Sequence, residues 1–415
     1  MSCSDMRFRS CHVSGNTGRV PRFEPFPAIR YSPELDLADV TAPPYDVLSD
    51  TDLDALEARH PRNIVHIDVP RDRDGRARYE AASARLAAWQ ADGTLCTDPR
   101  PGFTVYRMGF TDEAGRVRVI SGVIGALEVV DEGAGGVLPH ERTTPKAKTD
   151  RLDLTRATAA NLSPVWGLSL AGGLTALLAE PGEALGSFTG SDGVTHTVER
   201  IDDPRRTQAI ASLVASAEVV IADGHHRYAI SRLYRDERRA QAGEAPGPWD
   251  LTLTYVNELV AEQLSVAAIH RLYGAITDTE LTPALSRCFA FEPAGPVDAR
   301  TTLVMAERGA LCLVGRDGQG TLLHPRPEAF EGVRDLDSAR LEHALAGVVH
   351  DVAYQHGVAE VLDALASGRA DAAVLIRPVP VAEIRRTARE RLLMPPKSTF
   401  FTPKLKTGLV LRSVA

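Results

Sequence analysis

Hydrophobic and polar positions repeat along this chain in short blocks, and the repeat alternates between strand and helix periods. Residues 102–110 and 117–130 are rich in β-branched and aromatic side chains and flank a charged turn, which predicts a β-hairpin. Residues 76–93 repeat their apolar positions at helical spacing, which predicts an amphipathic helix. The alternation over residues 63–70 predicts a further strand.

The second half of the chain mixes the two patterns in the same way. Strands are predicted over residues 196–201, 217–222, 251–259, 264–273 and 372–379, and helices over residues 204–216, 225–241 and 381–396. Because strands and helices are mixed without strict alternation, the fold class expected is α+β (mixed α/β).

Three segments are predicted from these patterns. Residues 1–21 are polar and are expected to be a disordered leader. Residues 22–274 are expected to form a core domain with an Asp-Gly turn at its centre. Residues 275–415 are expected to form a C-terminal α+β region whose tail returns to the functional site.

Composition narrows the class of protein. The chain has 44% hydrophobic and 25% charged residues, as soluble globular proteins do, and lacks an apolar run of the ~20 residues that span a bilayer. No membrane association is expected. The formal net charge of -8 argues against a nucleic-acid partner, because such proteins usually present a basic face. Five scattered cysteines fit a reducing cytoplasm and no zinc cluster.

Lysine is rare and clustered in this chain. Of 47 basic residues only five are lysine, and they lie in two segments: Lys146, Lys148, Lys397, Lys404 and Lys406. A chain that otherwise uses arginine keeps lysine where a compact ammonium suits a phosphate, since the two side chains are not interchangeable at such contacts. The alternative is chance clustering in two surface loops.

The turn after residue 222 is the first candidate site. The apolar run "EVVIA" ends at Asp223-Gly224, and a helix follows at once. Gly224 allows positive φ and a close approach of a ligand to the backbone, while the helix start offers free N–H groups and partial positive charge. Asp223 is a candidate N-cap, metal ligand or general base.

Three cationic or hydrogen-bonding side chains follow in the first turn of that helix. The macrodipole opposes cations there, so His225, His226 and Arg227 cost stability unless an anion compensates them. This favours a phosphate or carboxylate pocket, with both histidines as candidate catalytic residues. A capped helix with surface histidines is the alternative. Adjacent histidines diverge by about 100° on a helix and suit a shared metal poorly.

The loop "LPHERTTPKAKTDR" is the second candidate. Its charged members are His140, Glu141, Arg142, Lys146, Lys148, Asp150 and Arg151. A carboxylate can take the proton of an attacking hydroxyl, so Glu141 is a candidate general base and the basic residues are candidate phosphate ligands. The alternative is a charged, solvated loop.

Two more segments carry candidate chemistry. "MPPKSTFFTPKLKTG" offers Lys397, Ser398 and Thr399, although it lacks the glycine-rich approach of a P-loop; a terminal strand docked on a sheet is its structural alternative. "TAPPYDVLSD" offers Tyr45 and Asp46 behind a stiff Pro-Pro, where an Asx turn is the alternative.

Four blocks, "APPYDVLS", "LPHERTTPKAKTDR", "IADGHHRY" and "MPPKSTFFTPKLKTGLV", occur in this order over nearly the whole chain from about Phe23. In these blocks the chain resembles family 1015 of the domains of unknown function. That family implies no secure biochemistry.

The strand–"DGHHR"–helix unit also resembles the signature turn of the ParB/sulfiredoxin superfamily, which includes CTP-binding partition proteins, ATP-binding sulfiredoxins and free serine kinases. The resemblance implies a ParB/sulfiredoxin-like core in which residues 223–227 hold phosphate. In the serine kinases a glutamate activates the serine hydroxyl, and Glu141 is the candidate here. The chain departs from the superfamily in the late position of the turn and in having no cysteine beside it.

The function expected is therefore phosphotransfer on a small hydroxyl-bearing metabolite, with serine or phosphoserine first, by a kinase-like or phosphatase-like enzyme. ATP or ADP with Mg²⁺ is the expected cofactor, with Asp223 or Asp46 near the ion, although no metal motif requires one. A small-molecule substrate is the expected partner. A ParB-type nucleotide-binding regulatory module and a metabolite-binding protein without turnover are the alternatives.

Overall fold

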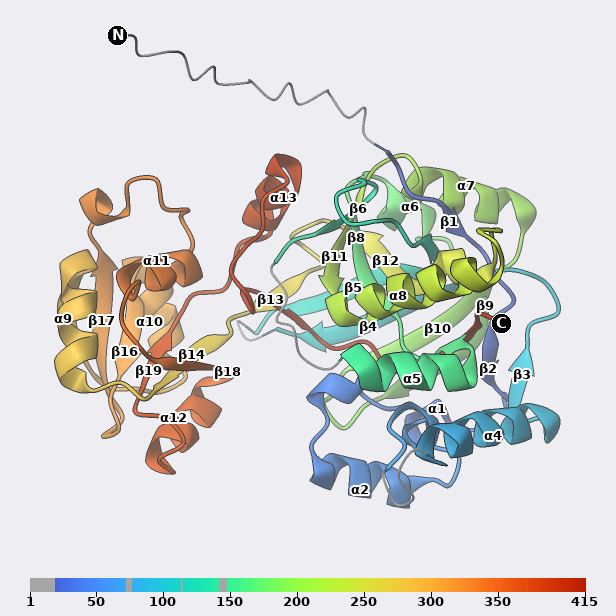
Figure 1. The fold of residues 1–415 in the computed structure, drawn as a ribbon, viewed down its shortest axis with the longest axis horizontal. Helices are drawn as coiled ribbons and strands as arrows, with labels where there is room; N and C mark the ends of the chain where they lie inside the picture. Colours follow the sequence, from blue (N-terminus) through green and yellow to red (C-terminus); the bar gives the residue numbers. More distant parts are fainter. Residues whose placement is uncertain (1–18, 72–76, 113–114, 142–147) are drawn as a thin grey trace, which may run out of the picture.

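A computed structural model describes residues 19–71, 77–112, 115–141 and 148–415. It shows two sheets side by side, the larger on the right of Figure 1 and the smaller on the left. Strands and helices are mixed in both parts, so the α+β (mixed α/β) class is confirmed. The ParB/sulfiredoxin-like core stays a prediction.

The larger sheet is mixed and has nine strands within the described residues. In spatial order it contains β6 (Val137–Pro139), β11 (Val219–Asp223), β8 (Val165–Ser169), β12 (Leu251–Glu258), β5 (Val117–Glu128), β4 (Phe103–Thr111), β10 (Thr195–Ile201) and β9 (Glu183–Thr189), with β1 (Phe23–Glu24) paired to β5. β4 and β5 form the predicted hairpin.

The smaller sheet has six strands and follows in the sequence. Its order is β15 (Phe289–Pro296), β17 (Gln319–Pro325), β16 (Leu311–Val314), β19 (Ala372–Leu375), β14 (His270–Gly274) and β18 (Asp351–Gln355). The predicted strand 264–273 is split: β13 (Ser265–Ala267) pairs with β20 (Phe400–Thr402), and β14 enters the smaller sheet. β14 thus lies with the C-terminal region, although the predicted boundary at 274/275 placed it in the core domain. The boundary itself stays a prediction.

The remaining elements connect and cover the sheets. Two more strand pairs are β2 (Ile29–Tyr31) with β3 (Leu95–Thr97), and β7 (Ala160–Asn161) with β21 (Arg412–Ser413). The helices are α1 (Leu37–Val40), α2 (Asp50–Arg59), α3 (Val65–Asp68), α4 (Ala77–Ala91), α5 (Lys148–Thr158), α6 (Leu174–Leu177), α7 (Pro204–Val214), α8 (His225–Gln241), α9 (Asp278–Cys288), α10 (Thr301–Arg308), α11 (Asp337–Ala344), α12 (Val358–Ala366) and α13 (Val381–Glu390), with short turns η1 (Tyr45–Val47), η2 (Pro248–Asp250) and η3 (Pro327–Phe330).

One element prediction was wrong. Residues 63–70, expected as a strand, contain the single-turn helix α3. The buried amide of Asn63 explains the difference: its Oδ1 accepts the Val65 N–H at 3.1 Å, and its Nδ2 donates to the Asp39 carbonyl at 2.7 Å. A buried side chain that hydrogen-bonds the local backbone in this way favours a turn over a strand.

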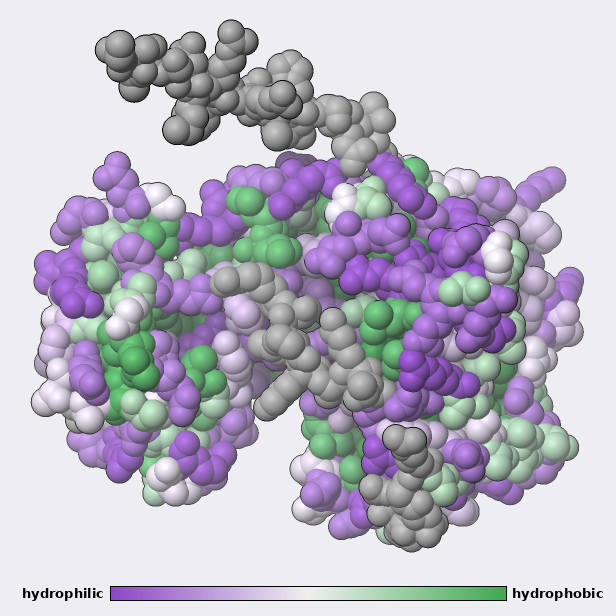
Figure 2. All heavy atoms as spheres, viewed as in Figure 1, coloured by the Kyte–Doolittle hydropathy of each residue, from purple (hydrophilic) through white to green (hydrophobic). Residues whose placement is uncertain are grey.

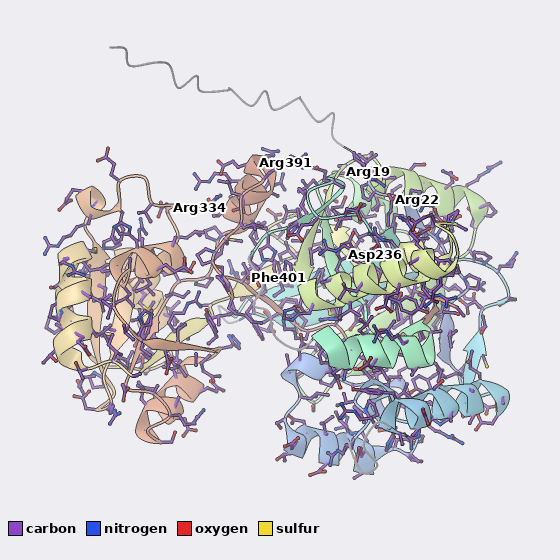
Figure 3. The ribbon with its side chains drawn as sticks, in the orientation of Figure 1. Arg19, Arg22, Asp236, Arg334, Arg391 and Phe401 are labelled. Atoms are coloured by element: carbon purple, nitrogen blue, oxygen red, sulfur yellow. The ribbon has the colours of Figure 1, made fainter. Side chains whose placement is uncertain are left out.

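The tail of the chain is part of the core of the larger sheet. Phe401, Leu405 and Leu409 belong to one buried cluster with Trp166 and Tyr255 of the sheet. Figure 3 places Phe401 between the two sheets. The segment after α13 therefore crosses back from the smaller sheet and covers one face of the larger one.

Helix α13 is fixed to both parts of the molecule. Arg334, on the side of the smaller sheet, donates to Glu383 at 2.6 Å, and Arg391 pairs at 2.7 Å with Glu218, which precedes β11 (Figure 3). Hydrophilic side chains cover the outer surface of α8 (Figure 2). None of the helices in the described part of the chain has the length and apolar content to cross a membrane.

Candidate functional site

The site forms where two parallel strands end. β6 pairs in parallel with β11, with Pro139 opposite Ile221. His140 and Glu141 follow β6, and Asp223 and Gly224 lie at the end of β11, so the two pairs leave the sheet on the same edge. This pairing explains why two segments about 80 positions apart meet, and polar residues at such strand ends commonly form ligand sites.

Helix α8 begins without a side-chain cap. Gly224 occupies the cap position with φ 82°, and within the described ranges no side-chain cap bonds the first turn. A Cβ at Gly224 would lie 3.1 Å from Arg227 and 3.3 Å from the Val165 backbone, so the position requires glycine. The N-cap role considered for Asp223 is thus not observed, and the first N–H groups of α8 remain available to an anion.

Asp223 is bound instead by two cations. Its Oδ2 lies 3.2 Å from Arg227 Nη2 and 3.4 Å from Lys404 Nζ. Burial acts to raise the pKa of this carboxyl, but Lys404 and Arg227 outweigh it and hold the pKa well below its usual range. Asp46 lies 3.8 Å from the same Arg227 amino group, so one guanidinium connects the turn with η1.

His225 points into the site without a partner. Its Nε2 is buried and accepts or donates no hydrogen bond among the described residues. Burial, reinforced by His140, His226 and Lys397, holds the pKa of His225 well below its ordinary value, against the opposing effect of Asp223. An unpaired buried ring nitrogen is costly, and an anionic ligand would give it a partner.

His140 has a supporting role beside it. The ring is fully buried, and its centroid lies 5.0 Å from that of His225. Nδ1 donates to the Ile221 carbonyl at 2.5 Å, which leaves Nε2 to accept the Thr399 hydroxyl at 2.7 Å. His140 therefore joins β11 to the tail rather than facing the cavity.

The tail supplies the remaining part of the site. Glu141 Oε2 accepts the Ser398 N–H at 3.1 Å, and the His140 carbonyl accepts the Met394 N–H at 2.9 Å. On the other side, the buried Arg271 donates to the Lys397 carbonyl at 3.0 Å. These bonds fix the backbone of Lys397, which has φ 54°, beside the start of α8.

A cavity of about 50 Å³ results from this convergence. It is lined by nine residues that the sequence predicted and by Pro396; the nine are Tyr45, Asp46, Glu141, Asp223, Gly224, His225, His226, Arg227 and Lys397. Four segments that are far apart in the chain thus meet in one place.

Other predicted residues lie elsewhere. Ser398 and Thr399 are buried and bind protein groups, so they support the site without lining it. The backbone of Lys148 begins α5, but its side chain, Arg142 and Lys146 lie outside the described residues. Lys406 pairs with Asp192 at 3.7 Å, and neither residue lines the cavity. Among the lysine side chains that the structure describes, Lys397 lines the cavity and Lys404 lies at Asp223 on its edge; a phosphate-binding role for them stays a prediction.

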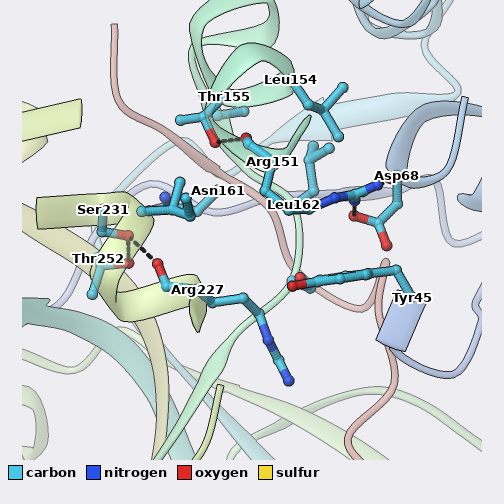
Figure 4. A pocket seen from close by; sticks show the side chains of 13 residues that line it. Tyr45, Asp68, Arg151, Leu154, Thr155, Asn161, Leu162, Arg227, Ser231 and Thr252 are labelled. Carbon is cyan, nitrogen blue, oxygen red and sulfur yellow. Dashed lines mark hydrogen bonds and ion pairs between the residues drawn. The ribbon is translucent and has the colours of Figure 1, made fainter. Parts of the chain in front are cut away.

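A second cavity of about 50 Å³ adjoins the first and shares Tyr45 and Arg227 with it (Figure 4). Arg151, predicted as a phosphate ligand, lies here, with its guanidinium 4.2 Å from the centre of the Tyr45 ring. Asp68 also lines this cavity and was missed, because the residues around it were interpreted as a strand. An acid inside an apolar run was the one signal that could have indicated it.

Comparison with known proteins gives one broad match. A family model described as "Protein of unknown function (DUF1015)" matches residues 23–339. No curated protein matches the chain.

Several solved structures are distantly similar. A conserved hypothetical protein from Pyrococcus furiosus has 12% identity and a TM-score of 0.35 over 66% of this chain and 92% of its own. A free serine kinase in complex with AMP has 13% identity and a TM-score of 0.35, over 66% and 88%. C-terminally truncated SbnI from Staphylococcus aureus has 11% identity and a TM-score of 0.38, over 70% and 87%.

Proposed function

This chain belongs to the DUF1015 family of proteins of unknown function, and we propose that it is a phosphotransfer enzyme acting on a small hydroxyl-bearing metabolite. The observation that carries the proposal is the Nε2 of His225 at the start of α8, which has no hydrogen-bond partner and no side-chain cap among the residues that the structure describes. A phosphoryl group there would receive backbone N–H groups, the positive end of the helix dipole and a ring nitrogen together.

The charges around this position suit phosphoryl transfer. Lys397 lines the cavity, and Lys404 and Arg227 stand at Asp223 on its edge. Catalysis of phosphoryl transfer depends mainly on positioning and on neutralising the charge of the transferred group. The charged side chains that line the cavity suit the phosphoryl end of an ATP or ADP.

Glu141 is the better of the two candidate bases. Asp223 is held ionised by two cations and has a pKa well below its usual range, so it binds a proton too weakly to accept one efficiently near neutral pH. Glu141 lines the cavity and is anchored through a single oxygen to the Ser398 N–H, which leaves its other oxygen for a hydroxyl or a water. We assign Asp223 to charge balance rather than proton transfer.

Mg²⁺ would enter with the nucleotide. Among the described residues no three His, Cys, Asp or Glu side chains are arranged to hold a metal by themselves. Mg²⁺ commonly binds one or two carboxylates together with substrate phosphates, and Asp46, which lines the cavity, is the carboxylate that fits this role. The ion would neutralise charge on the phosphates.

Serine and phosphoserine are the first substrates to test, because the "DGHHR" turn resembles that of free serine kinases. The purified chain is incubated with ATP or ADP, Mg²⁺ and L-serine, and separately with phosphoserine and water. Phosphoserine formation identifies a kinase and phosphate release a phosphatase, and either should be lost in Glu141→Gln. Nucleotide binding without either reaction would instead support the regulatory module.

A further inference from the structure

The second cavity adjoins the first, and Tyr45 and Arg227 line both of them. A molecule with a phosphoryl group at His225 would have to extend past these two side chains to enter the second cavity. Its wall carries the polar side chains of Asp68, Arg151, Asn161, Ser231 and Thr252 beside apolar ones such as Leu154 and Leu162 (Figure 4). Two side chains of opposite charge, Asp68 and Arg151, suit small charged groups of a ligand.

Asp68 is a buried carboxylate with too little positive charge around it. The residue is 3% exposed, and its Oδ1 lies 3.5 Å from Arg151 Nη1, beyond good hydrogen-bond distance. Within the described part of the chain no group donates to its Oδ2. Burial raises the pKa of Asp68, and Arg151 and Arg227 offset this only in part. Such a carboxylate at a cavity wall is suited to a cationic group of a ligand.

Arg151 provides the opposite charge in the same cavity. Its Nη1 donates to the Asp68 carbonyl at 2.5 Å, its Nε donates to Asp150 at 2.9 Å, and its plane lies over the Tyr45 ring. These contacts hold the guanidinium in one orientation. A held guanidinium is a good partner for a carboxylate of a ligand.

We infer that the second cavity binds the ammonium and carboxylate groups of a small α-amino acid, the ammonium at Asp68 and the carboxylate at Arg151. The inference rests on the proposed function and specifies its substrate class: an amino acid whose side-chain hydroxyl, or its phosphate, reaches His225. Asp68 is then a specificity residue, because it selects an amine over a hydroxyl at the α carbon.

Two ligands that differ at this carbon test the inference. Phosphoserine and 3-phosphoglycerate share the phosphate and the carboxylate, but 3-phosphoglycerate carries a hydroxyl in place of the ammonium. Calorimetric titration of the full chain should show phosphoserine binding about 10- to 100-fold more tightly, the range of one charge-assisted contact. Asp68→Asn should remove most of this preference. Equal affinities, an unchanged preference in the variant, or no binding of either compound would overturn the inference.

A matched control and a stability measurement separate this role from a structural one. Asp153→Asn removes the same charge from the same region, on helix α5, where Asp153 pairs with Arg156 at 2.6 Å and does not line the cavity. It should leave the preference unchanged. Without ligand, Asp68→Asn should melt at the same or a higher temperature, because it removes a buried charge. A lower melting temperature with unchanged binding would assign Asp68 a structural role.

The two proposals fail in different ways. If phosphoserine binds through Asp68 but no phosphate is transferred or released, the phosphotransfer function is wrong and the amino-acid site stands. If 3-phosphoglycerate and phosphoserine, or glycerate and serine, react equally well, the phosphotransfer function stands and the amino-acid site is wrong.

Discussion

The Nε2 atom of His140 lies 2.7 Å from the hydroxyl of Thr399, across 259 positions of sequence. Both side chains are buried, so this one bond ties the edge of the larger sheet to the tail that brings Lys397 to the site. Thr399→Val keeps the shape but leaves the ring nitrogen without its donor. We expect a loss of about 1–3 kcal/mol in the free energy of unfolding, measured by urea denaturation.

Thr195→Val is the control for that change, since Thr195 is exposed on β10 and its hydroxyl makes only a 3.5 Å contact. The control should alter the free energy of unfolding by less than about 0.5 kcal/mol. Equal effects of the two variants would contradict the role given to the His140–Thr399 bond.

Lys404 and Lys406 form a matched pair, two positions apart in the tail. Lys404 lies at Asp223 and over the Phe400 ring, whereas Lys406 pairs with Asp192. Lys404→Met should weaken the binding of inorganic phosphate about 10- to 100-fold, because one cation is lost and Asp223 loses a partner. Lys406→Met should bind phosphate normally. Isothermal titration calorimetry measures the phosphate affinity of each variant. Equal affinities in the two variants would mean that Lys404 does not contribute to the site.

Glu141→Gln tests the general base. The amide oxygen can still accept the Ser398 N–H, so the fold should persist while proton abstraction is lost. We expect kcat to fall about 10²- to 10⁴-fold with little change in KM. Glu132→Gln, at an exposed position paired with Arg232, is the control of equal charge. An unchanged kcat in Glu141→Gln would mean that another residue is the general base.

His225 should couple anion binding to proton uptake. Its pKa in the free protein lies well below 6.5, so the ring is neutral near neutral pH, and a bound dianion raises that pKa. At a pH between the pKa of His225 in the free protein and its pKa in the complex, anion binding takes up a proton. In this range the affinity for the anion therefore rises as pH falls. Sulfate, which does not titrate in this range, is the probe. Calorimetry in buffers of different ionisation enthalpy measures the uptake, which should vanish in His225→Asn and would contradict this assignment if it persisted.

Local sequence patterns predicted those elements in which the spacing of apolar residues matches the face that packs in the structure. The β4–β5 hairpin and helix α8 are of this kind: both carry an apolar repeat that continues into the packed structure. α3 was missed because the amide of Asn63 bonds to residues 39 and 41, a contact that no local pattern contains. The parallel pairing of β6 with β11, which assembles the site, is equally non-local.

The candidate site was predictable where residue types were unusual for their surroundings. The first-turn cations of α8 and the rare lysine at Lys397 are such signals, and the structure brings them together. Ser398 and Thr399 looked equally chemical in sequence, but their hydroxyls bind Ser338 and His140 in the interior. Whether a polar side chain faces a cavity or the core is decided by tertiary packing.

The position of the tail at the end of the chain also determines when, during synthesis, the candidate site and the core of the larger sheet can be completed. A ribosome releases His140 and His225 long before Lys397 and Lys404. Until Phe401 and the residues after it arrive, Trp166 and Tyr255 lack part of their covering, so the sheet is incomplete as well. A nascent chain therefore acquires its candidate site and a finished core at the same late stage, and chains arrested earlier would expose aromatic surface of the kind that chaperones and proteases recognise.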